Sequence, residues 1–258
     1  MALVGQGLVL VAGSIADKPA RMVAPGEPIE VLGPPPRFVS RGGDKLLAAL
    51  TRFAIDVTGA RTLDAGASTG GFTDCLLQSG ASSVVAVDVG HGQLHERLRD
   101  DPRVVNLERT DIRQVTMETV GGTPVDLVTA DLSFISASRA VPVLMSGIAV
   151  AEAPVLLLVK PQFEAGRVEV SRGKGVIRDP LVHRRTLGEV AGALVASGAV
   201  IMGAMPSPIT GHAGNIEFLL HARTPGTPSG RAETGVPPEV DAMMDAAVAE
   251  AHPGGAGE

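Results

Sequence analysis

The chain has 258 residues, a formal net charge of −6, 45% hydrophobic residues and 19% charged residues. This composition supports a folded core and excludes a chain that is disordered throughout. A single cysteine, Cys75, excludes a disulfide framework and any site built from several thiolates. The acidic net charge argues against a protein whose main task is to grip nucleic acid.

The charge is unevenly distributed along the chain. Residues 224–258 carry a local balance of −5, whereas residues 160–185 carry +4. Such a basic segment is compatible with a polyanionic partner and equally with solvated loop charge. No apolar run approaches the roughly 20 residues that cross a bilayer, and the glycine-broken N-terminus indicates strand and turn rather than a secretion signal. We therefore expect a cytoplasmic protein.

The first elements along the chain are short. Residues 1–33 hold two apolar runs, 8–11 and 29–32, which are too little chain to bury a core of their own. Three consecutive prolines at 34–36 then favour an extended linker. We expect a partial domain over 1–33, a linker over 34–40, a main domain over 41–223 and a disordered acidic tail over 224–258, the tail with at most a short helix near 240–251.

Strands and helices alternate through the main domain. Buried-strand patterns cover 61–64, 84–88, 125–130 and 155–159, helical patterns cover 71–78, 136–145 and 181–195, and a closing strand pair is indicated at 200–205 and 215–220. This alternation is typical of an α/β fold with a mostly parallel, doubly wound sheet, which binds ligands at the carboxyl ends of its strands. We expect a Rossmann-like sheet with an antiparallel closing strand.

A glycine-rich turn, DAGASTGGF at 64–72, separates the first of these strands from its helix. Gly66 permits close backbone approach to a ligand, and Gly70 and Gly71 open the helix where amide donors are free. Asp88 ends the next strand, where a carboxylate can accept both ribose hydroxyls. Together these features predict a nucleoside-type cofactor.

The turn also indicates which cofactor it binds. Position 68 is Ser, so the spacing departs from G-x-G-x-x-G, and Asp64 ends the strand. A pyrophosphate avoids a nearby carboxylate, whereas a sulfonium cofactor with an α-amino group gains from one. S-adenosylmethionine (SAM) is therefore favoured over NAD. Asp111, after a third short strand, is placed either to accept from the adenine amino group or to cap a helix.

Four charged residues stand in unusual settings. Lys45 begins a helical pattern, Asp131 and Lys160 end apolar runs, and Glu217 lies inside the apolar segment 214–220. A charge at the end of a buried strand is costly to desolvate unless it is paired, although each one alone is more often a surface charge. Their coincidence on one sheet predicts a polar cluster that faces the cofactor.

Five motifs in order, SRGGDKL, DAGASTGGF, ADLSF, LVKPQFE and GNIEFLL, resemble the TlyA (haemolysin A) family of FtsJ-like methyltransferases over residues 4–223. The resemblance implies SAM-dependent 2′-O-methylation of cytidine in ribosomal RNA, with ribosomal RNA or ribosomal subunits as partners and no metal ion. It implies a catalytic tetrad of Lys45, Asp131, Lys160 and Glu217. It also implies a cofactor site that includes Asp64, Gly66, Ser68, Thr69, Gly70, Gly71, Phe72 and Asp88, to which we add Asp111 and Asp131.

The tetrad suits this chemistry, because a ribose 2′-hydroxyl must lose its proton as it attacks the sulfonium methyl group. Lys160 is a candidate base or orienting cation; burial and Lys45 favour a neutral amine there, whereas the two carboxylates favour a charged one, so both roles stay open. Positioning supplies most of the catalysis. For the substrate we expect Arg41, Phe134, Phe163, Arg167, Arg172 and Lys174, with the two phenylalanines stacking a base unless they only fill the core.

The N-terminus departs from the family pattern. Residues 4–33 resemble only the last part of the family's RNA-binding domain, whose two basic helices are missing. Either the start lies downstream of the true one, or a grip on RNA is lost and the enzyme methylates a small molecule. A membrane-active haemolysin is a third hypothesis, disfavoured by the absence of a cationic amphipathic helix or a spanning segment. The sequence leaves the oligomeric state open.

Overall fold

The structure is a computed structural model that describes residues 2–33, 36–226 and 236–253, and the chain divides into two compact units, Met1–Arg37 and Phe38–Glu258. The smaller unit contains a short helix and a three-stranded antiparallel sheet of order β2-β1-β3. Its elements are α1 (Ala2–Gly5), β1 (Val9–Val11), β2 (Ser14–Ile15) and β3 (Ile29–Val31). Val11 and Ala16 are its buried apolar residues, so this unit has only a small core.

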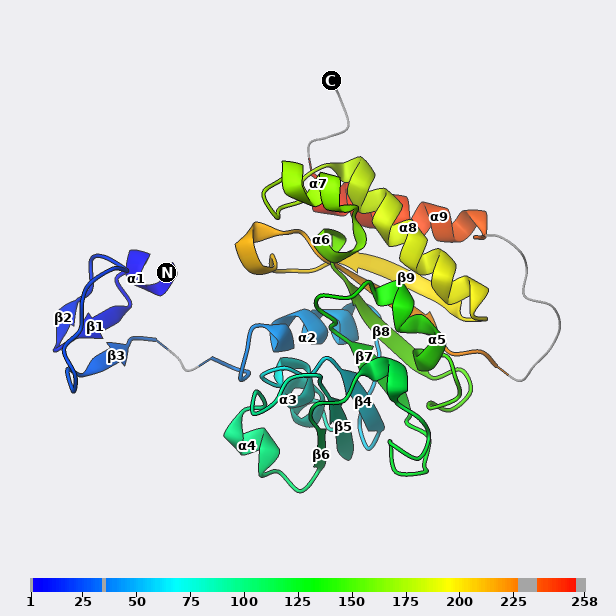
Figure 1. The fold of residues 1–258 in the computed structure, drawn as a ribbon, viewed down its shortest axis with the longest axis horizontal. Coiled ribbons are helices and arrows are strands. Elements are labelled where there is room, and N and C mark those ends of the chain that lie inside the picture. Colours follow the sequence, from blue (N-terminus) through cyan, green and yellow to red (C-terminus); the bar gives the residue numbers. More distant parts are fainter. Residues whose placement is uncertain (1, 34–35, 227–235, 254–258) are drawn as a thin grey trace. The chain divides into compact units, whose positions relative to one another are not determined.

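The larger unit is built on a seven-stranded sheet of order β6-β5-β4-β7-β8-β10-β9 (Figure 1). Its strands are β4 (Arg61–Ala65), β5 (Ser83–Val87), β6 (Val104–Leu107), β7 (Leu127–Ala130), β8 (Pro154–Val159), β9 (Val200–Pro206) and β10 (Phe218–Arg223). Strands β6, β5, β4, β7 and β8 pair in parallel, and β10 runs antiparallel between β8 and β9. The predicted mostly parallel sheet with an antiparallel closing strand is thereby confirmed.

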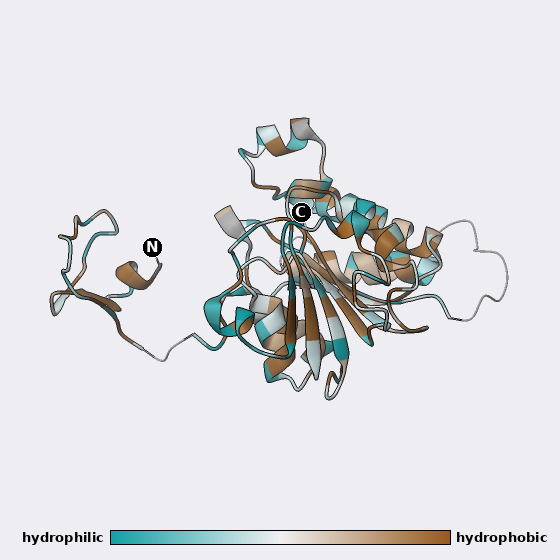
Figure 2. Cartoon of the chain, turned by 60° about the horizontal axis from the view of Figure 1, so that its bottom comes forward, coloured by the Kyte–Doolittle hydropathy of each residue, from teal (hydrophilic) through white to brown (hydrophobic). Residues whose placement is uncertain are grey.

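Helices cover both faces of this sheet, and the hydrophobic strands lie between them (Figure 2). One apolar cluster lies between the sheet and α2 (Gly42–Arg52), α3 (Gly71–Gln78) and α4 (Glu96–Arg99). The other lies beneath η2 (Ala137–Arg139), α5 (Val141–Leu144), α8 (Pro180–Ala196) and α9 (Pro238–Ala251). The shorter elements η1 (Ile112–Gln114), α6 (Pro161–Glu164), α7 (Arg167–Arg172) and η3 (His212–Gly214) lie in the connections.

The topology brings the chemistry-bearing residues to one edge of the sheet. Because β7 and β8 are parallel, the residues that follow them, Asp131 and Lys160, leave the sheet at the same edge. Strand β10 runs the other way, so its first residue, Phe218, pairs with Val159 near the end of β8. Glu217, which directly precedes β10, therefore arrives beside Lys160 from the opposite chain direction.

Three sequence expectations need correction. The helix expected over 136–145 is broken into η2 and α5, with Pro142 in the first turn of α5, since proline lacks the amide that a continuous helix would use. The tail, expected to be disordered with at most a short helix near 240–251, forms α9 over 238–251, which buries Val240, Met244, Ala247 and Val248 against the sheet. Glu217 precedes strand β10 rather than lying within it.

The linker expected over 34–40 also ends earlier in the structure. Phe38 is buried beneath the start of α2, where a side chain on Gly43 would overlap its ring. The backbone amide of Val39 donates to Asp74 of α3 over 2.8 Å. Residues 38–40 therefore pack as part of the larger unit.

Candidate active site

Two adjoining cavities open at the carboxyl edge of the sheet. The first, of about 530 Å³, is lined mainly by the start of α2, the glycine-rich turn, Asp131, Ser133 and Lys160. The second, of about 410 Å³, lies between that turn, the end of β5 and the segments 110–113 and 131–135. Both cavities share Gly66, Ser68, Asp131 and Ser133. They can therefore hold two parts of one extended ligand.

The glycine-rich turn fits closely against the loop after β7. Gly66 has a φ of +85°, and a Cβ there would lie 2.5 Å from the backbone oxygen of Asp131, so only glycine fits. Ser68, Thr69, Gly71 and Phe72 line the first cavity, as expected for a cofactor site. Gly70 lines neither cavity; its φ of +97° and its contact with Leu98 give it a packing role at the start of α3.

Two carboxylates line the second cavity in addition to the shared Asp131. Asp88 accepts hydrogen bonds from the backbone amides of Ser68 (2.8 Å) and Gly90 (2.6 Å), which ties the turn to the end of β5. Asp111 caps η1 and is paired with Arg113, and hydrogen bonds from Arg113 lower the pKa of Asp111 to about 2. Of the two roles expected for Asp111, the cap is present, and its carboxylate also borders the cavity.

Asp64 lies elsewhere. Its side chain is fully buried, accepts a 2.7 Å hydrogen bond from the Thr73 hydroxyl and lines neither cavity. Burial raises the pKa of Asp64 to about 7, with a further increase from Asp131, while hydrogen bonds from Thr73 and Thr129 oppose it. The structure thus places Asp64 beneath the turn, where it joins β4 to α3 and β7 rather than facing a ligand.

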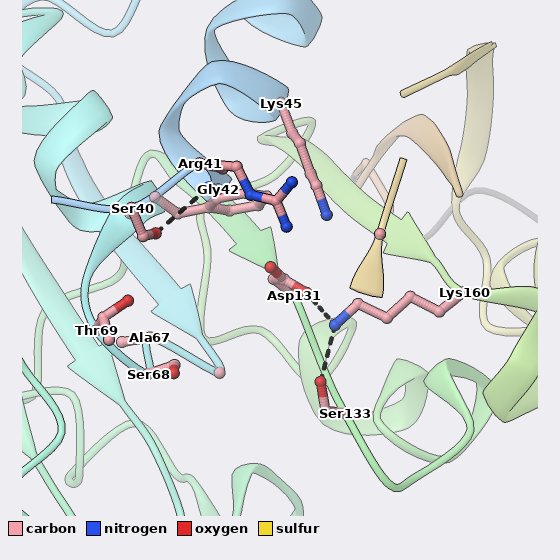
Figure 3. Close-up of a pocket in the computed structure, with 14 residues that line it drawn as sticks. Ser40, Arg41, Gly42, Lys45, Ala67, Ser68, Thr69, Asp131, Ser133 and Lys160 are labelled. Atoms are coloured by element: carbon pink, nitrogen blue, oxygen red, sulfur yellow. Dashed lines mark hydrogen bonds and ion pairs between the residues drawn. The ribbon is translucent and has the colours of Figure 1, made fainter. Parts of the chain in front are cut away.

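The four tetrad residues form two ion pairs, and three of them, Lys45, Asp131 and Lys160, line the first cavity (Figure 3). Lys160 Nζ lies 2.5 Å from Asp131 Oδ1 and donates to Ser133 Oγ over 2.8 Å. Lys45 Nζ lies 2.5 Å from Glu217 Oε2. Both lysines are 8% exposed, and in Figure 3 both point toward the space beside Asp131. Each buried cation therefore has a carboxylate partner, as burial requires.

Glu217 is enclosed by two neighbours that the sequence analysis did not single out. Gln162 Nε2 donates to Glu217 Oε1 over 3.3 Å. A Cβ on Gly211 would lie 2.0 Å from the same oxygen, so the loop before β10 closes directly over the carboxylate. Ser133 and Gln93, which contacts Ser68, were also missed. Ser133 lies within the ADLSF motif, but nothing in the sequence indicates that its hydroxyl faces Lys160.

The expected substrate residues fall into two groups. Arg41 lines the first cavity and Phe134 the second, and the Phe134 ring centroid lies 5.5 Å from that of Phe163. Phe134 is 90% exposed, so it is not a core residue. Arg172 and Lys174 are exposed and line neither cavity. Arg167 begins α7, and its side chain lies outside the described part of the chain.

The cavities fit SAM. The second one combines the apolar side chains of Val87, Ile112, Leu132 and Ile135 with the carboxylates of Asp88 and Asp111, which suits an adenosine. The glycine-rich turn also lines the first cavity, so a ligand bound along it would extend from the second cavity to the tetrad. The methyl group to be transferred must lie beside these residues. Among the described residues, no group of three or more His, Cys, Asp or Glu side chains could hold a metal ion, and no helix could cross a membrane. Fold and site thus define a Rossmann-like methyltransferase.

Comparison with known proteins identifies the family. Residues 38–224 match the model of the FtsJ-like methyltransferases. The 16S/23S rRNA (cytidine-2′-O)-methyltransferase TlyA of Mycobacterium tuberculosis is 49% identical over 223 residues, which span 86% of this chain and 82% of the relative. Hemolysin A of Brachyspira hyodysenteriae is 40% identical, with 83% and 88% covered.

A solved structure of a Streptococcus thermophilus protein named as a hemolysin superposes with a TM-score of 0.79 at 39% identity, covering 96% of this chain and 88% of that one. The chain therefore belongs to the TlyA (haemolysin A) family of FtsJ-like, SAM-dependent methyltransferases. The resemblance drawn from its five motifs is confirmed.

Proposed function

We propose that this protein methylates the 2′-hydroxyl of a cytidine ribose in ribosomal RNA, acting in the cytoplasm on ribosomal RNA or ribosomal subunits. The observation that carries the proposal is the paired Lys45–Glu217 and Lys160–Asp131 cluster beside the cavities that fit SAM. The 49% identity to an rRNA cytidine-2′-O-methyltransferase supports the choice of acceptor.

When bound, SAM supplies an electrophilic methyl group at the junction of the two cavities. Gly66, Ser68 and Thr69 of the glycine-rich turn and the Asp88 carboxylate would hold it there. The backbone of Gly66 packs closely against the loop after β7, which keeps the glycine-rich turn next to Asp131. The cofactor site and the tetrad are therefore positioned as one rigid surface, which favours in-line transfer.

Lys160 is the residue placed to act on the ribose hydroxyl. Its Nζ atom is held by Asp131 and Ser133 at the wall of the first cavity. From there it can orient the hydroxyl oxygen and, when uncharged, accept its proton as the oxygen attacks. Lys45 lines the same cavity, and together with its buried partner Glu217 it forms a fixed dipole that can stabilise the developing charge on the reacting groups.

Arg41, Phe134 and Phe163 supply the acceptor contacts in this proposal. Arg41 is exposed at the cavity, and its guanidinium suits a backbone phosphate. The exposed Phe134 ring and its neighbour Phe163 offer a surface on which an unstacked base can lie. Arg172 and Lys174, on the exposed basic segment, would add contacts to the surrounding RNA backbone.

The test is transfer of tritiated methyl groups from SAM to purified small and large ribosomal subunits, naked ribosomal RNA and a low-molecular-weight extract. We expect label in ribosomal RNA, at a site that resists alkaline cleavage because its 2′-hydroxyl is blocked. Lys160→Ala should abolish the label, whereas Arg103→Ala, which removes an exposed arginine remote from both cavities, should not. Label confined to small molecules, or carried on a base, would contradict the proposal.

A further inference from the structure

Two loops leave the sheet side by side and carry the acceptor side of the site. Residues 131–137, which run into η2, follow β7, and residues 160–164, which include the short helix α6, follow β8; we call them the 131–137 loop and the 160–164 loop. Two contacts between them are already described, namely Lys160 with Asp131 and Ser133, and Phe163 with Phe134. The loops are thus in contact at their bases and through their aromatic rings.

Glu164 makes a third connection between these loops. One carboxylate oxygen accepts from the Ser136 hydroxyl over 2.6 Å, and the other accepts from the Ala137 amide over 2.7 Å. Ala137 begins η2, whose own N-cap residue, Ser136, makes no side-chain cap, so Glu164 caps η2 from the neighbouring loop. Burial raises the pKa of Glu164, although both hydrogen bonds oppose that increase. This carboxylate lines neither cavity.

The position of Phe134 requires such support. Its φ of +69° is unfavourable for a bulky residue and persists only where neighbouring structure enforces it. The ring is 90% exposed, so packing of its own side chain cannot supply that constraint. The constraint can come from the residues on either side of Phe134. Before Phe134, Ser133 is hydrogen-bonded to Lys160; after it, Ser136 and Ala137 are hydrogen-bonded to Glu164.

We infer that Glu164 is a positioning residue, whose carboxylate fixes the 131–137 loop against the 160–164 loop and thereby holds Phe134 and Ser133 in place beside Lys160. The inference rests on the function proposed above in one respect, namely that Phe134, Ser133 and Lys160 act on the acceptor. The mechanical part, a loop held by Glu164, is independent of which acceptor is used.

The composition of the chain allows a direct optical test. The sequence contains no tryptophan and no tyrosine, so Phe134→Trp introduces a single indole at the mouth of the site. Its fluorescence anisotropy reports how firmly position 134 is held, without any methyl transfer. Glu164→Ala in this background should lower the anisotropy. Glu169→Ala is the matched control, because Glu169 also caps a helix start, accepting from Gly166 over 3.0 Å, but has no contact with the 131–137 loop.

Glu164→Gln separates positioning from charge. A glutamine can accept from the Ala137 amide and donate to the Ser136 hydroxyl, which serves as donor or acceptor. This variant should therefore keep the anisotropy of the parent. In methyl transfer without the indole, Glu164→Ala should lower kcat/KM for the acceptor by about ten- to a hundredfold, the loss expected for hydrogen bonds to a charged group, and Glu164→Gln should restore most of it.

Equal anisotropy for the parent and Glu164→Ala would overturn the inference, whatever the activity. Loss of activity without a change in anisotropy would do the same, as would a Glu164→Gln variant that behaves like Glu164→Ala. Should Glu164→Ala not fold, Ser136→Ala removes one partner of the carboxylate and takes its place. If the wild-type protein transfers no methyl group to ribosomal RNA, the proposed function fails, while the anisotropy comparison still decides the role of Glu164.

Discussion

Lys45 and Glu217 are 172 residues apart in sequence, yet their side chains meet in a buried ion pair 2.5 Å long. Removal of one partner leaves the other charge buried and unpaired, which costs about 3–5 kcal/mol of stability. Lys45→Met should therefore lower the free energy of unfolding by that amount. The double variant Lys45→Met/Glu217→Gln should recover most of it, as urea denaturation would measure.

Both variants should lose methyl transfer, because neither retains the charged pair. A double variant that is stable and still turns over at the wild-type rate would show that the pair only supports the fold.

Substitution of Asp88 should weaken SAM binding, whereas substitution of Glu217 should lower kcat. Asp88→Ala deletes the acceptor for the Ser68 and Gly90 amides at the second cavity, so calorimetry should show SAM binding weakened by about tenfold or more. Glu217→Ala should leave SAM affinity unchanged and lower kcat, since Glu217 touches Lys45 rather than the glycine-rich turn. Weaker SAM binding in Glu217→Ala together with unchanged SAM binding in Asp88→Ala would contradict the assignment of the two cavities.

Glycine and alanine at position 134 should differ in stability but should both weaken binding of the acceptor. Glycine adopts a positive φ without strain, whereas alanine does not, so Phe134→Gly should be more stable than Phe134→Ala by about 1 kcal/mol in thermal unfolding. Both should bind the RNA acceptor less well than the wild type, since each lacks the exposed ring. Equal melting temperatures for the two variants would mean that the φ of this residue differs in solution.

Gly211 should be essential for reasons of space. A methyl group there would meet the Glu217 carboxylate, so Gly211→Ala should displace Glu217 from Lys45 and lower kcat, with SAM affinity retained. Gly192→Ala is the matched control in α8, where the nearest atom to the added Cβ is 3.4 Å away. Wild-type turnover in Gly211→Ala would indicate that the loop before β10 is free to move aside.

His221 should make the protein sensitive to acid. Burial, with a smaller effect of Arg223, lowers the pKa of His221 from 6.5 to about 4, so between these values the unfolded state binds a proton that the folded state does not. Stability from this group is complete above pH 6.5 and falls as the pH decreases toward 4. Between pH 7 and pH 5 the loss should be about 2 kcal/mol. In urea denaturation, His221→Leu should lose about 2 kcal/mol less stability than the wild type between pH 7 and pH 5. An equal loss in both proteins would contradict the role of His221.

The sequence was sufficient for the fold because β5 and β8 are almost unbroken runs of Val, Leu and Ala, and because the glycine-rich turn lies at a strand–helix junction. It failed over 136–145, where an apolar pattern was interpreted as one helix although Pro142 interrupts it. Over 238–251 it allowed only a short helix in a disordered tail, because Pro, Gly and acidic residues surround the four apolar residues that this helix buries.

The candidate site was predictable in its charged members but not in their pairing. Lys45, Asp131, Lys160 and Glu217 are conspicuous because charges there interrupt or end apolar runs. Which carboxylate meets which amine depends on strand order and register, which no local pattern encodes. For the same reason Asp64 was expected at the ligand, whereas the structure buries it against Thr73.

The direction of β10 has a consequence for when the enzyme can work. Glu217 joins the site only because the last strand of the sheet inserts antiparallel between β8 and β9. On a translating ribosome, the glycine-rich turn and both lysines emerge well before that strand. A chain that ends before residue 217 would thus lack the carboxylate that pairs with Lys45, and the tetrad is complete only once the final strand has been added.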